Sequence, residues 1–204
     1  GHEIASHSYS HHDLRKISDE VLEDELKKSV ASLEKISNEK VQGFRAPFFS
    51  ISKHNLDKFN IIKKYFKYDS SIFPAKTPLY GISDAPRFAY HFSSETPLES
   101  SSDGDLLEIP PATLKIPVYG NIPIAGGFHF RFLPIFLIKY GINKLNKLGQ
   151  SAMCYIHPKD LDKSMPIINS YSWHYYYNLK NAKSKFESIL KNFKFCSVRE
   201  VYSL

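Results

Sequence analysis

Cysteine is scarce in this sequence, and no long apolar run is present. The 204 residues include two cysteines, Cys154 and Cys196, which lie far apart along the chain. Two such residues are too few for a disulfide framework or a cysteine-rich zinc site, so we interpret both as small buried hydrophobic side chains. No apolar stretch approaches the ~20 residues that a membrane-spanning helix needs. We therefore expect no membrane span in this chain.

A block of like charge is missing as well. The formal charge of +6 arises from basic residues that alternate with Asp and Glu along the chain. This distribution argues against a dedicated nucleic-acid surface, and we expect no nucleic-acid partner. Neither an internal repeat nor a long low-complexity segment is visible. Aromatic residues are abundant, with 13 Tyr and 15 Phe. Because aromatic faces stack on sugar rings, this composition is compatible with a carbohydrate ligand.

The sequence pattern alternates helices with short strands. Helical spacing of apolar residues predicts helices over about 18–36, 52–66, 134–148 and 180–192. Short apolar runs predict strands over about 3–6, 41–44, 66–68, 106–109, 152–156 and 195–201, of which 152–156 is expected to be buried on both faces. The segment 74–105 is predicted to be a covering loop with hairpin content. We therefore expect an α/β fold with a mainly parallel sheet, in a single domain over residues 1–204.

Reactive side chains follow four of these strands. His7 and His11 have the i, i+4 spacing at which two imidazoles can face one metal ion if the backbone turns helically. Arg45, Asp69 and His157 each follow a later strand. In α/β barrels chemistry collects at the carboxyl ends of the strands, which favours one shared site. Each residue also has an ordinary alternative role. His7 and His11 could be surface histidines, and Arg45 could be a structural ion-pair partner. Asp69 could belong to a turn, and His157 could be a core histidine.

In this order, the clusters resemble the polysaccharide deacetylases of carbohydrate esterase family 4, the NodB-homology domain. His7-Ser8-Tyr9-Ser10-His11 is similar to the family's His-Ser/Thr-x-x-His metal motif. Arg45-Ala46-Pro47-Phe48 is similar to its Arg-x-Pro-Tyr motif with Phe for Tyr, and Tyr155-Ile156-His157 to its late hydrophobic-x-His motif. Further segments resemble a bacterial subgroup linked to exosortase and exopolysaccharide loci. These segments are Gly1–His7, Gly43–Pro47, Tyr68–Pro74 and Ala125–Pro134. The resemblance also implies a C-terminal part specific to this subgroup, from about 75 to 204.

The resemblance implies a distorted, incomplete (β/α) barrel and a metal-dependent hydrolase. Its substrate would be an N-acetylated bacterial polysaccharide or oligosaccharide, and acetate would be released. A divalent metal, with Zn²⁺ as the first candidate, would bind His7, His11 and an Asp. In the family that Asp and the catalytic base form an Asp-Asp motif on the first strand, which would precede Gly1. We therefore expect that the sequence is truncated at its N-terminus, and that residues 1–204 alone bind metal weakly and have little activity.

The same resemblance assigns roles to the other residues. His157 would protonate the departing amine, Asp69 would orient His157, and Arg45 would anchor the base. A backbone N–H near Phe48 would help to hold the oxyanion. His129 and Arg131 are assigned from their residue types and not from the resemblance: we expect them to line a sugar groove, with simple packing as the alternative. The Trp that follows the family's Asp is absent near Asp69.

Two other functions stay open. One is a non-catalytic carbohydrate-binding relic of the same fold, and the other is a different zinc amidohydrolase with a small substrate. The sequence does not decide between the bacterial cytoplasm and the cell envelope.

Overall fold

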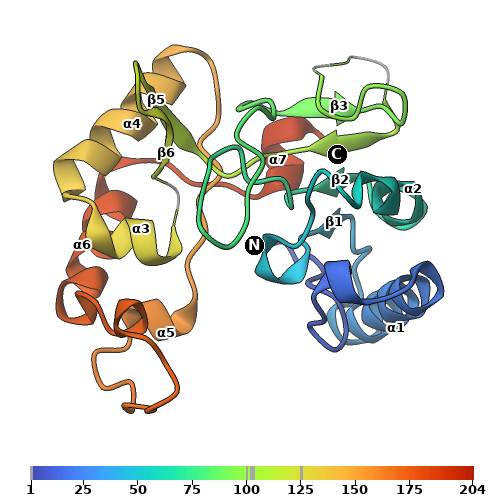
Figure 1. The fold of residues 1–204 in the computed structure, drawn as a ribbon, viewed down its shortest axis with the longest axis horizontal. Coiled ribbons are helices and arrows are strands. Elements are labelled where there is room, and N and C mark those ends of the chain that lie inside the picture. The colour runs from blue at the N-terminus through green and yellow to red at the C-terminus, as the bar shows by residue number, and fades with distance from the viewer. Residues whose placement is uncertain (1, 100, 102–103, 125) are drawn as a thin grey trace. The chain divides into compact units, whose positions relative to one another are not determined.

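The computed structural model describes residues 2–99, 101, 104–124 and 126–204 (Figure 1). Gly1 and Ala125, which belong to motifs quoted above, lie outside this set. The chain forms two compact units, one of residues 1–110 with 197–204 and the other of residues 111–196. The single domain expected from the sequence stays a prediction, because compactness alone does not show that either unit folds by itself.

The first unit contains a four-stranded sheet in the order β1-β2-β4-β3. The strands β1 (Gly43–Phe44), β2 (Tyr68–Asp69) and β4 (Leu106–Glu108) are parallel, and β3 (Tyr90–Phe92) pairs antiparallel with β4. The predicted α/β class is therefore confirmed as a mixed α/β fold, and β3 confirms strand content in the 74–105 excursion. The distorted barrel stays a prediction.

Helix α1 (Asp19–Ser37) is the long helix of this unit, as the sequence predicts. Ser18 is its N-cap and accepts a hydrogen bond from Val21 N at 3.4 Å. Asn38 ends the helix in a left-handed conformation. The buried face of α1 packs against α2 (Phe59–Ile62) and contributes to a hydrophobic core that includes Leu22, Leu26, Phe44, Phe59 and Ile62.

The helix predicted from Ser52 is shorter than expected. The Oδ1 atom of Asn55 accepts hydrogen bonds from Ser52 N at 2.7 Å and Ser52 Oγ at 2.9 Å, which favours a local turn over a helical start. Helical structure therefore begins only after Asn55. The unit also has short 3₁₀ turns, namely η1 (Leu14–Lys16), η2 (Pro47–Phe49) and η3 (Leu56–Lys58).

The final strand predicted over 195–201 is wrong, because the chain forms helix α7 (Val198–Tyr202) there. Ser197 and Glu200 form a capping box. Glu200 Oε2 accepts from Ser197 N at 2.9 Å, and Ser197 Oγ accepts from Glu200 N at 3.4 Å. This reciprocal capping outweighs the strand propensity of the two valines in the segment.

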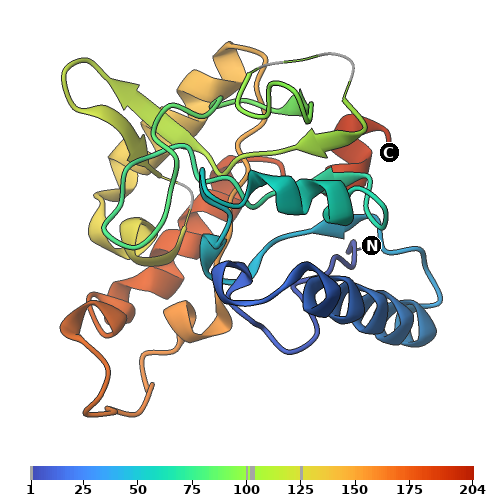
Figure 2. The ribbon, with the colours of Figure 1, turned by 45° about the vertical axis from the view of Figure 1, so that its right-hand side comes forward.

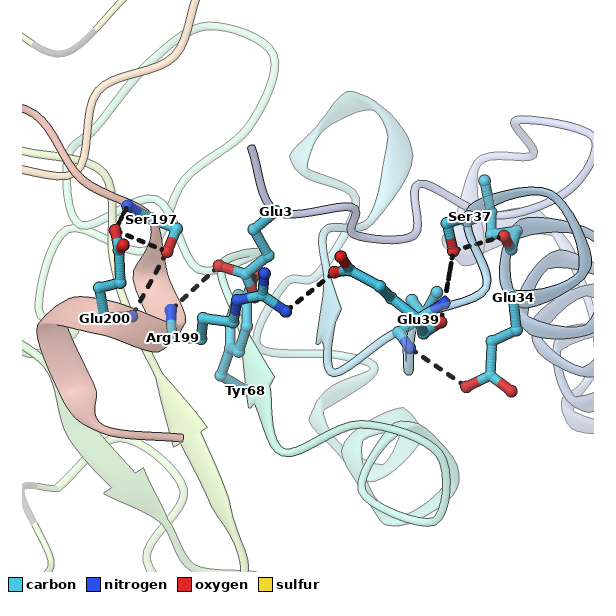
Figure 3. Close-up of polar contacts among 10 residues, drawn as sticks. Glu3, Glu34, Ser37, Glu39, Tyr68, Ser197, Arg199 and Glu200 are labelled. Atoms are coloured by element: carbon cyan, nitrogen blue, oxygen red, sulfur yellow. Dashed lines mark hydrogen bonds and ion pairs between the residues drawn. The ribbon is translucent and has the colours of Figure 1, made fainter. Parts of the chain in front are cut away.

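Helix α7 lies beside the strands of the first unit, although it comes from the other end of the chain (Figures 1 and 2). Figure 3 shows the contact in detail. Glu3 Oε2 accepts from Arg199 N at 3.0 Å and Glu3 Oε1 accepts from Tyr68 Oη at 3.0 Å. The Glu3 carboxylate thus satisfies a first-turn N–H group of α7, where helices lack internal acceptors.

The second unit combines a hairpin with helices. Helix α6 (Leu179–Asn192) packs against α3 (Gly127–Phe132) and α5 (Pro158–Leu161). The helices predicted over 134–148 and 180–192 are confirmed, whereas the hairpin was not expected. The elements are β5 (Thr113–Ile116), β6 (Gly120–Pro123), α3 (Gly127–Phe132), α4 (Ile135–Lys147), α5 (Pro158–Leu161), η4 (Trp173–Tyr175) and α6 (Leu179–Asn192).

The strand predicted over 152–156 is reduced to one parallel bridge between Gly126 and Tyr155. A Cβ atom on Gly126 would lie 1.8 Å from the Tyr155 carbonyl oxygen, so the close approach of the two backbones requires glycine there. The run is half-buried, not buried on both faces. Cys154 is half-buried and Cys196 is exposed, so the expectation of two buried thiols is wrong for Cys196. Among the described residues, no helix is long and apolar enough to cross a bilayer.

Candidate functional site

Backbone pairing with β1 positions the histidine segment. The strand predicted over 3–6 is only a single parallel bridge between Ser6 and Phe44. Ser6 N donates to Gly43 O at 2.8 Å, and Arg45 N donates to Ser6 O at 3.0 Å. The backbones of His7 and Arg45 therefore lie side by side just after the bridge, and His7 Nδ1 lies 2.6 Å from Arg45 O.

The rings of His7 and His11 lie together, with centroids 4.9 Å apart and an interplanar angle of 70°. A carbonyl oxygen only accepts hydrogen bonds, so His7 donates from Nδ1 to Arg45 O, and the neutral ring carries its lone pair on Nε2. Metal-binding histidines usually have this arrangement, because the second nitrogen donates to a carbonyl or carboxylate. The rings of Phe48 and His11 form a T-shaped contact, with centroids 4.7 Å apart.

The two imidazoles do not meet through a helical turn, which corrects the route expected from their spacing. Ser8 and His11 have positive φ values of 66° and 57°, and Phe48 and Phe49 have φ values of 59° and 50°. Left-handed conformations cost about 1 kcal/mol or more for each residue with a Cβ atom. Four strained residues in two adjacent segments therefore need strong local support.

Glu25 of α1 supplies part of this support. Its side chain is 6% exposed, and Oε2 accepts from Ser8 Oγ at 2.7 Å, Tyr9 N at 3.1 Å and Ser10 N at 2.6 Å. Burial alone would raise the pKa of Glu25, but the hydrogen bonds from Ser8 and Ser10 outweigh it and lower the pKa to about 2. The ionised carboxylate thus holds the loop between the two histidines.

Arg45 is held by the chain that follows β2. Its Nε donates to Ser70 O at 2.9 Å and its Nη2 donates to Ser70 Oγ at 2.6 Å. Ala46 N donates to Ser71 Oγ at 2.8 Å. The guanidinium therefore has a fixed position in the first unit, beside the His7 segment. Anchoring of a catalytic base by Arg45 stays a prediction.

Asp69 is fully buried and lies opposite Glu108 in the register of β2 and β4. Ser71 N and Ser71 Oγ donate to the two oxygens of Asp69 at 2.7 and 2.8 Å. Glu108 Oε1 accepts from Ile72 N at 3.0 Å, and Oε2 has no donor among the described residues. Burial, followed by the charge of Asp69, raises the pKa of Glu108 well above its ordinary value.

A hydrogen bond between the side chains of Asp69 and Glu108 requires a proton on one of the two carboxyl groups. The pKa of Glu108, raised well above its ordinary value, favours Glu108 as the protonated partner. Through Ser71, the pair also supports the backbone of Ala46 next to Arg45.

In the second unit, His157 contacts a different carboxylate. His157 Nδ1 lies 3.2 Å from Asp160 Oδ2, and the opposite oxygen, Asp160 Oδ1, lies 3.1 Å from Arg131 Nε. The side chain of His157 is 54% exposed, whereas those of Asp160 and Arg131 are 3% and 4% exposed. Orientation of His157 by Asp69, which belongs to the other unit, stays a prediction.

The three residues expected to bind substrate differ in exposure. Phe48 is 53% exposed. Arg131 is buried, and its Nη1 donates to Tyr175 O at 3.2 Å and Tyr177 O at 2.6 Å, so it supports Asp160 and does not present an open guanidinium fork. Burial lowers the pKa of His129, whose Nδ1 lacks a hydrogen-bond partner in the described part of the chain. Direct substrate contacts stay predictions for all three residues.

The donor set of His7 and His11 suits a divalent metal, since both are imidazoles and His7 already donates its second nitrogen to a carbonyl. Across residues 2–99, 101, 104–124 and 126–204, no group of three or more His, Cys, Asp or Glu side chains is arranged to hold a metal ion. The described residues therefore offer two ligands at this place.

Sequence reasoning missed Glu25, Glu108 and Asp160. Glu25 had a visible signal, because it lies on the apolar face of its helix, one residue before Leu26. Asp160 also had one, since it stands three residues after His157 with Pro158 between them, a spacing typical of a helix cap. Glu108 had none, because its partner comes from a strand about 40 residues earlier.

Comparison with known proteins agrees with this mixed α/β fold. Residues 1–64, which contain His7, His11 and Arg45, match the family model described as Polysaccharide deacetylase. Residues 70–203 match the model described as Domain of unknown function (DUF3473). The first match supports a relationship to the polysaccharide deacetylases. The second covers more than half of the chain, so the chain belongs to the DUF3473 family.

Individual relatives point the same way. A peptidoglycan deacetylase of Helicobacter pylori is 31% identical over 116 residues, which are 54% of this chain and 39% of that protein. A probable polysaccharide deacetylase of Pseudomonas aeruginosa PAO1 has a TM-score of 0.54 at 11% identity, over 100% of this chain and 59% of that one. PuuE allantoinase has a TM-score of 0.57 at 13% identity, over 100% and 58%. The two structures show a shared fold, and the chain spans less than two thirds of the length of each of the three proteins.

Proposed function

We propose that the protein is a metal-dependent hydrolase that removes N-acetyl groups from an N-acetylated bacterial polysaccharide or oligosaccharide and releases acetate. The observation that carries this proposal is the His7–His11 pair, which is held beside Arg45 by the Glu25 carboxylate and a backbone carbonyl. The deacetylase family match over residues 1–64 and the H. pylori peptidoglycan deacetylase support the same reaction. A link to exosortase and exopolysaccharide loci is part of the proposal and rests on the sequence resemblance.

His7 and His11 would hold a divalent metal through imidazole nitrogens, and Zn²⁺ is the first candidate. When bound, the metal polarises an amide carbonyl and lowers the pKa of a water molecule. Hydrolysis adds water across the amide C–N bond and gives acetate and a free amine. His157 would donate the proton that the departing nitrogen needs. Arg45 would orient the carboxylate base that the resemblance assigns to the first strand of the fold.

The test is acetate release by the protein expressed from its complete gene. We expect release from N-acetylated glucosamine polymers, loss of release with a chelator, and recovery with Zn²⁺. His7→Ala and His11→Ala should abolish release, whereas His54→Ala, an exposed imidazole in another segment, should leave it unchanged. Metal-independent release, or no release from any N-acetylated sugar, would contradict the proposal.

The same assay distinguishes the alternatives. Saturable binding of the sugar without acetate release would indicate a carbohydrate-binding relic. Release only from short N-acetylated compounds would indicate another amidohydrolase. For residues 1–204 alone we expect weak Zn²⁺ binding and little activity, and tight binding in calorimetry would contradict this expectation.

A further inference from the structure

A buried carboxylate fixes His157 from three residues further along the chain. Asp160 Oδ2 accepts two hydrogen bonds from His157, one from its backbone N at 3.2 Å and one from ring Nδ1 at 3.2 Å. Asp160 is the third residue of α5, which begins at Pro158. One carboxylate oxygen therefore ties the imidazole to its own main chain, which restricts the side-chain rotation of His157.

Asp160 is itself fixed from the other side. Its Oδ1 forms an ion pair with Arg131 Nε at 3.1 Å, and both side chains are buried. The guanidinium also donates to the carbonyl oxygens of Tyr175 and Tyr177. Burial alone would raise the pKa of Asp160, but the hydrogen bonds from His157 and the charge of Arg131 bring it below its ordinary value. Asp160 is therefore ionised at neutral pH.

We propose that Asp160 is the positioning residue of His157, held in place by Arg131. An ionised carboxylate only accepts hydrogen bonds, so His157 keeps its proton on Nδ1 and transfers protons through Nε2. The choice of reaction rests on the proposed function: His157 Nε2 gives its proton to the departing amine and regains one from water after product release. The orienting carboxylate is then Asp160, in the same unit as His157, and not Asp69.

Nitrogen NMR of the 204-residue chain with labelled histidine tests this assignment without any need for activity. The His157 signals are identified by their loss in His157→Gln. In the unaltered chain we expect neutral His157 to carry its proton on Nδ1, whereas free imidazoles in water favour Nε2. Asp160→Asn should shift the population towards the Nε2-protonated form, and Asp160→Glu should retain much of the original state.

Asp162→Asn is the matched control, because this nearby carboxylate is exposed and bonds only to Ser164 among the described residues. It should leave the His157 signals unchanged. A predominantly Nε2-protonated ring in the unaltered chain would overturn the proposal even if Asp160→Asn failed to fold. An unchanged ring in a folded Asp160→Asn variant would overturn it as well.

Kinetics of the protein from the complete gene separate this inference from the proposed function. If acetate is released, Asp160→Asn should lower kcat by roughly 10- to 100-fold with little change in KM, since orientation supports but does not replace proton transfer. Asp160→Glu should recover part of the rate. An unchanged kcat would contradict positioning by Asp160. If the unaltered protein releases no acetate, the proposed function fails, while the NMR result still decides the role of Asp160.

Discussion

Glu25 shows how a single buried carboxylate can organise a candidate site. It accepts hydrogen bonds from Ser8, Tyr9 and Ser10, and so stabilises the strained loop that brings His7 and His11 together. The histidine spacing alone predicts the pair of imidazoles, but it does not predict how they are held. The donors to Glu25 are mostly backbone N–H groups, which leave no trace in the sequence.

Glu25→Gln should lower the free energy of unfolding by about 1–3 kcal/mol at pH 7, because charged hydrogen bonds to a buried group are replaced by weaker neutral ones. The lowered pKa fixes the sign of the pH dependence. The charged carboxylate contributes stability above its ordinary pKa of 4.5, and this contribution is lost as the pH falls towards about 2.

Denaturant unfolding between pH 7 and pH 3 measures this difference. Asp24→Asn is the control on the same helix, since Asp24 forms an exposed pair with Lys28 and should matter by less than about 1 kcal/mol. A Glu25→Gln effect that stays constant down to pH 3 would contradict the account.

At the scale of the elements, the sequence predicted the long helices well. The helices α1, α4 and α6 have clear apolar spacing, and Ser18 is a plain N-cap signal. Short elements were predicted poorly. Strands of two to four residues carry too few alternating positions to be recognised. Helix α7 was missed because the strand propensity of its residues was given more weight than its capping box.

The pairing of β2 with β4 creates the Asp69–Glu108 pair, which no sequence pattern indicates. If the two groups share a proton, Glu108→Gln should keep the free energy of unfolding within about 1 kcal/mol at pH 7, because the amide reproduces both the donor to Asp69 and the acceptor for Ile72 N. Glu108→Ala should cost about 3 kcal/mol or more, because Asp69 would lose its partner and a cavity would form.

Chemical denaturation of both variants decides this point. The raised pKa predicts that the stability of the unaltered chain declines as the pH rises above the ordinary value of 4.5, and Glu108→Gln should lose this decline. Equal destabilisation by Gln and Ala would indicate an ionised Glu108 and contradict the shared proton.

At the scale of the whole molecule, residues 197–204 belong to the first compact unit although the second unit precedes them in the chain. Their contact with Glu3 ties the two ends of the chain together within that unit (Figure 3). Sequence order alone does not reveal this return, because it depends on a carboxylate meeting a helix N-terminus about 200 residues away.

Removal of residues 197–204 should destabilise the first unit by about 2 kcal/mol or more, since the Glu3 carboxylate loses the hydrogen bond from Arg199 N and the surface that these residues cover becomes exposed. Limited proteolysis should then cut within residues 1–110 first. Arg199→Ala is the control, because it removes only the exposed pair with Glu39 and keeps the backbone N–H that binds Glu3. Unchanged resistance after truncation would contradict this role for α7.

The proposed reaction requires that His7 and His11 share one site with His157. A crystal structure of the protein from the complete gene, grown with Zn²⁺ and measured at the zinc absorption edge, tests this requirement most directly. The account predicts an anomalous peak bound by His7 and His11, with His157 Nε2 facing the same hollow at a distance that one acetamide group can bridge. A metal peak away from these two histidines, or His157 on the opposite side of the molecule, would contradict it.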